Sequence, residues 1–107
     1  MSEPSTRPQQ AGLVGTDAEL EHAKEEFSRA LGVNLHRLRL ERGISQERLA
    51  HMAGLSAYTY QKFEKGESKP GTPMNPRLFT LIALSQVLDT PLSELLPPEL
   101  PDVTSGR

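Results

Sequence analysis

The chain of 107 residues contains no cysteine, so it can form neither a disulfide nor a cysteine-ligated metal site. No apolar run approaches the roughly 18 residues that a membrane-spanning helix needs, and the N-terminus lacks the apolar region of a signal peptide. We therefore expect a cytoplasmic protein without a membrane partner.

Patterns that carry catalysis or bind metal are missing as well. The three histidines, His22, His36 and His51, have no carboxylate or cysteine at ligand spacing, so we expect no metal and no other cofactor. There is no glycine-rich phosphate loop, and the serines are accounted for as helix caps without nucleophilic chemistry. The sequence therefore argues against an enzyme.

Both ends of the chain are poor in apolar residues. Residues 1–16 are mainly small and polar with prolines, and residues 97–107 begin with two prolines and contain a third. Such compositions bury too little apolar surface to offset chain entropy, so both ends are predicted to be disordered tails. One small domain remains between them.

The net charge of −2 conceals an uneven distribution along the chain. Residues 1–28 carry two basic and six acidic residues, whereas residues 29–69 carry eight basic and four acidic ones. A positive middle segment is what phosphate binding needs, although an excess of this size is also common on surfaces that bind nothing.

Apolar residues recur at helical spacing, and no segment alternates as a strand would, so the domain is predicted to be all-α with five helices. A residue suited to capping a helix N-terminus precedes each expected helix. These caps are Thr16, Ser45, Ser56, Asn75 and Thr90. Three prolines and a glycine at residues 69–76 predict an extended loop.

Gly32 interrupts the first helical stripe, which ends at Gly43. A glycine inside a helix costs about 1 kcal/mol relative to alanine, so this segment is either one helix or two. Residues 17–34 are predicted to form an N-terminal helical extension. Its apolar stripe packs either on its own domain or on a second copy. The stripe consists of Leu20, Ala23, Phe27 and Ala30.

Residues 45–64 contain the most informative pattern, two short helices separated by Gly54. The glycine permits a sharp turn, and Ser45 and Ser56 each cap one of the helices. This spacing is typical of a helix-turn-helix, a unit that holds its second helix against the major groove of DNA.

With these helices placed, residues 35–96 resemble the Cro and lambda-repressor helix-turn-helix family, also called the xenobiotic-response-element (XRE) family. The resemblance implies a five-helix, lambda-repressor-like DNA-binding domain. The matching residues are Leu38, Arg39 and Pro70 and the segments 42–50, 53–56, 63–66 and 92–96.

The resemblance also implies roles for single residues. Gln46 is expected to contact a DNA phosphate; outside this context it would be an ordinary exposed helix residue. Arg39 and Glu64 are expected to form an ion pair that sets the angle of the recognition helix, with Arg39 also near a phosphate. Lys65 and Lys69, just past that helix, suit further phosphate contacts.

Base reading is expected from the outward face of residues 56–65. Gln61 can pair with adenine and Lys62 with guanine. Ala57 or Tyr58 can contact a thymine methyl group, although the Tyr58 hydroxyl could instead reach the DNA backbone. The base-reading candidates are Ser56, Ala57, Tyr58, Thr59, Gln61 and Lys62.

The expected function is therefore a sequence-specific DNA-binding transcriptional regulator, which acts on double-stranded DNA as a homodimer. Two alternatives remain open: an adaptor module that keeps this fold for protein interaction, and the antitoxin of a toxin–antitoxin pair. A protein partner could bind the N-terminal helix or the loop at residues 70–76, which is longer than usual for the family. A passive surface loop is an equally good interpretation.

Overall fold

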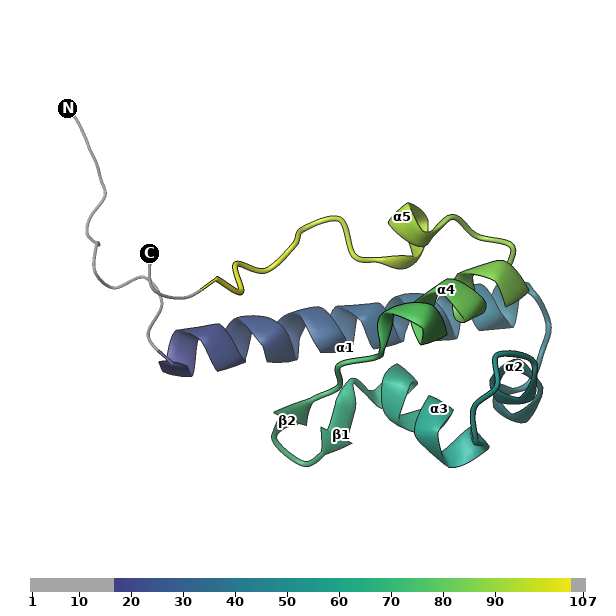
Figure 1. Ribbon diagram of the computed structural model, residues 1–107, viewed down its shortest axis with the longest axis horizontal. Helices are drawn as coiled ribbons and strands as arrows, with labels where there is room; N and C mark the ends of the chain where they lie inside the picture. Colours follow the sequence, from purple (N-terminus) through teal and green to yellow (C-terminus); the bar gives the residue numbers. More distant parts are fainter. Residues whose placement is uncertain (1–16, 105–107) are drawn as a thin grey trace.

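The computed structural model describes residues 17–104 (Figure 1). Its elements in chain order are helices α1 (Asp17–Glu41), α2 (Gln46–Met52) and α3 (Ala57–Lys65), strands β1 (Glu67–Lys69) and β2 (Thr72–Pro73), and helices α4 (Leu78–Val87) and α5 (Leu92–Leu95). Within these residues no helix is both long enough and apolar enough to cross a membrane.

Gly32 does not break the first helix, because α1 is continuous over 25 residues. The glycine faces the C-terminal end of α3. A Cβ atom at Gly32 would lie 2.7 Å from the Phe63 carbonyl oxygen and would overlap the carbonyl of Glu64. Gly66, which follows α3, allows the same close approach of α3 to α1, since a Cβ at Gly66 would lie 2.8 Å from the Cα of Arg29. The two glycines therefore let α1 and α3 meet backbone to backbone.

The predicted caps of the two short helices are present. The Ser45 hydroxyl accepts a hydrogen bond from the Arg48 amide at 3.0 Å, and the Ser56 hydroxyl accepts one from the Thr59 amide at 3.1 Å. Gly54 has a φ of 79°, so the turn between α2 and α3 uses the left-handed conformation that favours glycine.

The caps predicted for the last two helices are wrong. The N-terminal flanking residues of α4 and α5 are Arg77 and Pro91, and neither helix has a side-chain cap. The Thr90 hydroxyl instead donates to the Leu88 carbonyl, two residues back. Thr16, the cap predicted for the first helix, lies outside the described residues.

The helical class is right, but the prediction of an all-α domain with an extended loop is wrong at residues 67–73. There β1 and β2 pair as an antiparallel hairpin, with Gly71 in its turn at a φ of 81°. Ser28 of α1 donates to the Met74 carbonyl at 2.7 Å, and the Met74 amide donates to Gly66 at 2.9 Å. Strands of three and two residues are too short to show the alternation of apolar and polar residues that predicts a strand. The hydrogen bonds that hold the hairpin join distant parts of the chain, which the local sequence pattern does not show.

The hydrophobic core lies between the C-terminal half of α1 and the other four helices. The largest fully buried side chains are Tyr60, Leu35, Leu49, Leu84, Leu88 and Leu95. After α5 the chain runs back along α1 (Figure 1). Residues 97–101 and the α1 residues Ala23, Phe27 and Ala30 line one hollow, and Pro97 is buried. The stripe on the helical extension therefore faces this chain's own C-terminal segment, which has no helix or strand at residues 97–104.

Candidate nucleic-acid interface

The outward face of α3 carries three of the six predicted base-reading residues, Tyr58, Gln61 and Lys62. Tyr58 is 69 % exposed and Gln61 is exposed, whereas Tyr60 and Phe63 on the opposite face are buried. The Lys62 ammonium lies 4.4 Å from the centre of the Tyr58 ring, within the range of a cation–π interaction. A cation and an aromatic ring are thus presented together.

The candidates at the start of α3 are placed differently. The Ser56 hydroxyl caps the helix and donates to the Thr59 hydroxyl at 3.0 Å, so both hydroxyls already have partners within the chain. Ala57 and Thr59 are half-buried. Tyr58 and Gln61 are therefore the exposed members of the outward group, and the half-buried Lys62 belongs to it through its ammonium over the Tyr58 ring.

Behind this face, the Glu64 carboxylate joins three helices. Arg39 Nε of α1 donates to Glu64 Oε2 at 2.7 Å, so the structure contains the ion pair expected from the resemblance. Tyr60 of α3 donates its hydroxyl to the same oxygen at 2.5 Å. Gln46 Nε2 of α2 donates to Glu64 Oε1 at 2.9 Å. One buried side chain thereby fixes the orientation of α3 relative to α1 and α2.

The electrostatics of this cluster keep both ion-pair partners charged. Burial alone would raise the pKa of Glu64, but hydrogen bonds from Arg39, Tyr60, His36 and Gln46 outweigh it and lower that pKa to about 2. The hydrogen bond to Glu64 raises the pKa of Arg39. The pKa of Tyr60 is also raised, mainly by burial and to a lesser extent by its hydrogen bond to Glu64. Removing one partner would leave the others buried without compensation.

Two residues that were predicted to contact DNA phosphates, Arg39 and Gln46, take part in this cluster. Arg39 is 8 % exposed, and its guanidinium also donates to the Ile44 carbonyl at 3.0 Å. Its guanidinium is therefore engaged mainly within the domain, and its contact with a phosphate stays a prediction. Gln46 uses one N–H of its amide for Glu64, which leaves the second N–H for another acceptor. Lys65 and Lys69 are exposed at the ends of α3 and β1.

Sequence reasoning missed two members of the cluster. His36 Nδ1 lies 3.0 Å from Glu64 Oε1 and 3.2 Å from Arg39 Nη2, and the Tyr60 hydroxyl donates to Glu64 Oε2. Helical spacing contains a signal for both residues. His36 precedes Arg39 by three positions and Tyr60 precedes Glu64 by four, which places each pair on one helix face.

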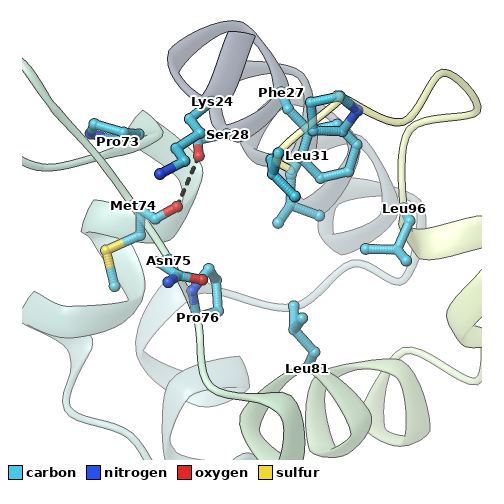
Figure 2. A pocket seen from close by; sticks show the side chains of 12 residues that line it. Lys24, Phe27, Ser28, Leu31, Pro73, Met74, Asn75, Pro76, Leu81 and Leu96 are labelled. Atoms are coloured by element: carbon cyan, nitrogen blue, oxygen red, sulfur yellow. Dashed lines mark hydrogen bonds between the residues drawn. The ribbon is translucent and has the colours of Figure 1, made fainter. Parts of the chain in front are cut away.

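A second cavity, of about 480 Å³, lies away from this face (Figure 2). Phe27 and Leu31 of α1, Leu81 of α4 and Leu96 give it an apolar lining, and none of its described lining residues belongs to α2 or α3. Residues 17–104 contain no cluster of three or more histidine, aspartate or glutamate side chains placed to hold a metal ion.

A family model described as Helix-turn-helix matches residues 35–95, more than half of the chain. No curated protein sequence matches the chain. The match begins within α1 and covers α2, α3 and the hairpin. Domains of this type indicate DNA binding in transcription regulation. The chain therefore belongs to the Cro/C1-type helix-turn-helix family, the XRE family.

Proposed function

We propose that this protein is a sequence-specific transcriptional regulator, without enzymatic activity, that inserts α3 into the major groove of DNA. One observation carries the proposal: Tyr58, Gln61 and Lys62 face outward together on a helix whose orientation Glu64 fixes from behind. A recognition helix must keep a fixed angle to the major groove, because contacts with the bases depend on accurate hydrogen-bond geometry.

The side chains suit distinct tasks at the DNA. The Gln61 amide can bond adenine N6 and N7, and the Lys62 ammonium can donate to guanine O6 and N7. The Tyr58 ring beside it offers an apolar contact to a thymine methyl group. Gln46, in the first turn of α2, would use its second amide N–H on a phosphate, which sets register without reading sequence.

The protein is proposed to act as a homodimer. Two-fold symmetry would place two copies of α3 in successive major grooves, on half-sites about 34–36 Å apart. Binding should then weaken steeply as salt increases, because each phosphate contact releases counterions.

Selection of bound duplexes from a random pool, followed by titration of the selected sequence, tests the proposal. Lys62→Ala should cost about 1–3 kcal/mol and relax preference at one base pair. A uniform loss over all sequences would assign Lys62 to the DNA backbone instead. If no duplex is enriched and none is bound at low salt, the proposal fails.

A second candidate function, protein interaction, is favoured by the cavity of Figure 2. Its lining is largely apolar, and most of the lining comes from the helical extension and residues 73–76, with Leu81, Leu96, Pro101 and Val103 completing it. An adaptor would bind a protein there and would bind no duplex, so the same titration separates the two candidates.

A further inference from the structure

The Glu64 carboxylate is surrounded by more polar groups than it can accept hydrogen bonds from. Arg39 Nε at 2.7 Å and the Tyr60 hydroxyl at 2.5 Å both donate to Oε2. Three further nitrogen atoms lie around Oε1: Gln46 Nε2 at 2.9 Å, His36 Nδ1 at 3.0 Å and Arg39 Nη2 at 3.3 Å. A carboxylate oxygen offers about two lone-pair positions, so these three groups compete for Oε1.

His36 is the member of this group whose hydrogen-bonding role can change. Its Nδ1 lies between an acceptor, Glu64 Oε1, and a donor, Arg39 Nη2, which is 3.2 Å away. An unprotonated Nδ1 accepts from the guanidinium and leaves Oε1 to the other donors. A protonated Nδ1 can only donate, and the carboxylate is the acceptor within reach. The proton on this nitrogen therefore decides how many donors Oε1 receives.

His36 is also the member that solvent protons reach. Its side chain is 54 % exposed, whereas those of Glu64 and Arg39 are 7 % and 9 % exposed. Among residues 17–104, the charged groups against the ring are Glu64 of α3 and Arg39 of its own helix. From α2 comes the neutral Gln46, and the Tyr60 hydroxyl binds the other carboxylate oxygen. A histidine ring gains a proton between about pH 8 and pH 5, whereas Glu64, with a pKa of about 2, stays ionised over that range.

We propose that His36 is a positioning residue that makes the hydrogen bond between Gln46 and Glu64 depend on pH. Protonated His36 and Arg39 are both charged donors, and charge-assisted hydrogen bonds are about twice as strong as neutral ones. Together they occupy Oε1 and displace the neutral Gln46 amide.

This inference rests on the proposed function, in which Gln46 contacts a DNA phosphate. The bond to Glu64 orients the Gln46 amide, so losing that bond weakens the phosphate contact and DNA binding weakens as the pH falls. The direction is distinctive. Simple attraction between a protonated imidazole and the phosphates would instead strengthen binding at low pH.

The test titrates a selected duplex at pH 8 and pH 6 at one salt concentration. The unaltered protein should bind about threefold to fivefold more weakly at pH 6, which corresponds to most of one neutral hydrogen bond. His36→Asn keeps an amide near the position of Nδ1 but does not titrate, so its affinity should be equal at the two pH values. Gln46→Ala should bind more weakly at both, again with no difference between them.

His22→Asn is the matched control, because His22 lies on α1 in an exposed pair with Glu26 and away from the cluster. It should show the same pH difference as the unaltered protein. If His36→Asn or Gln46→Ala keeps the full pH difference, or if the unaltered protein binds more tightly at pH 6, the inference is overturned and the regulator proposal stands.

A measurement without DNA separates the two proposals further. Nitrogen-15 relaxation of the Gln46 side-chain amide in the free protein should show greater mobility at pH 6 than at pH 8, and no such change in His36→Asn. Equal mobility at both pH values in the unaltered protein would overturn the inference. If no duplex is bound at either pH, the regulator proposal fails, and the relaxation measurement still decides whether His36 controls Gln46.

Discussion

The two halves of α1 belong to one continuous helix but lie in very different surroundings. Every buried residue of α1 falls between Ser28 and Arg39, whereas none of residues 17–27 is buried. The C-terminal half contributes Leu35 to the core and Arg39 to the Glu64 cluster. The N-terminal half faces the apolar cavity of Figure 2 and the returning C-terminal segment.

This difference shows where the domain ends and the extension begins. The family match starts at residue 35, inside the buried half of the helix. Helix continuity therefore does not define the domain; burial does. Changes in the buried half should alter the free energy of unfolding strongly, and matched changes in residues 17–27 should not.

The largest difference is expected between Glu64→Ala and Glu25→Ala. Glu64→Ala leaves the Arg39 guanidinium and the Tyr60 hydroxyl buried without their acceptor, which should lower the free energy of unfolding by about 3–5 kcal/mol. DNA binding should weaken mainly through this loss of stability. Glu25→Ala should cost less than about 0.5 kcal/mol. Urea denaturation measures both, and an unchanged midpoint for Glu64→Ala would contradict the role given to this cluster.

Leucine truncation on the two halves gives the next contrast. Leu35 is fully buried, so Leu35→Ala should cost about 2–5 kcal/mol through lost burial and the cavity left behind. Leu20 is only half-buried, and Leu20→Ala should cost less than about 1 kcal/mol. Thermal unfolding of the two variants under the same conditions checks the comparison. Equal losses would mean that the extension is as much part of the core as the C-terminal half.

Gly32→Ala sets helix propensity against packing. Alanine would favour the helix by about 1 kcal/mol, but its Cβ would meet the Phe63 and Glu64 carbonyls, where overpacking costs about 1–3 kcal/mol or more. We expect net destabilisation of about 1–2 kcal/mol. Val33→Ala, at the exposed neighbouring position, should change stability little. A more stable Gly32→Ala protein would show that α1 and α3 do not approach so closely.

The last comparison is the pH dependence of the Glu64 contribution. Its pKa of about 2 in the folded protein lies below the usual unfolded value near 4.3. The carboxylate therefore stabilises the fold fully above about pH 5, and this contribution declines as the pH falls toward 2. The stability difference between the unaltered protein and Glu64→Gln should shrink over that range in urea titrations. A constant difference would contradict the lowered pKa.

Local signals were enough to predict the helix-turn-helix. The caps Ser45 and Ser56 and the glycine turn at Gly54 act within a few residues, and sequence shows such short-range chemistry directly. The resemblance supplied the Arg39–Glu64 pair. Gly32 was read as a potential break because its cost to a helix is local, whereas its use depends on the distant end of α3.

Other features depend on contacts between distant segments. The hairpin is held by Ser28 and Gly66, which come from α1 and the end of α3. Sequence does not show that Arg39 also donates to the Ile44 carbonyl, a partner that only the folded chain brings within reach. Helix periodicity predicts which face turns inward, but it does not predict which partner lies there.

Site-directed crosslinking tests the central claim, that the outward face of α3 enters DNA, most directly. The chain has no cysteine, so a photoreactive label on Gln61→Cys or on His22→Cys marks one known position in each region. The account predicts that the label on α3 crosslinks to a selected duplex and that the label on the helical extension does not. Equal crosslinking from both positions, or crosslinking from position 22 alone, would contradict it.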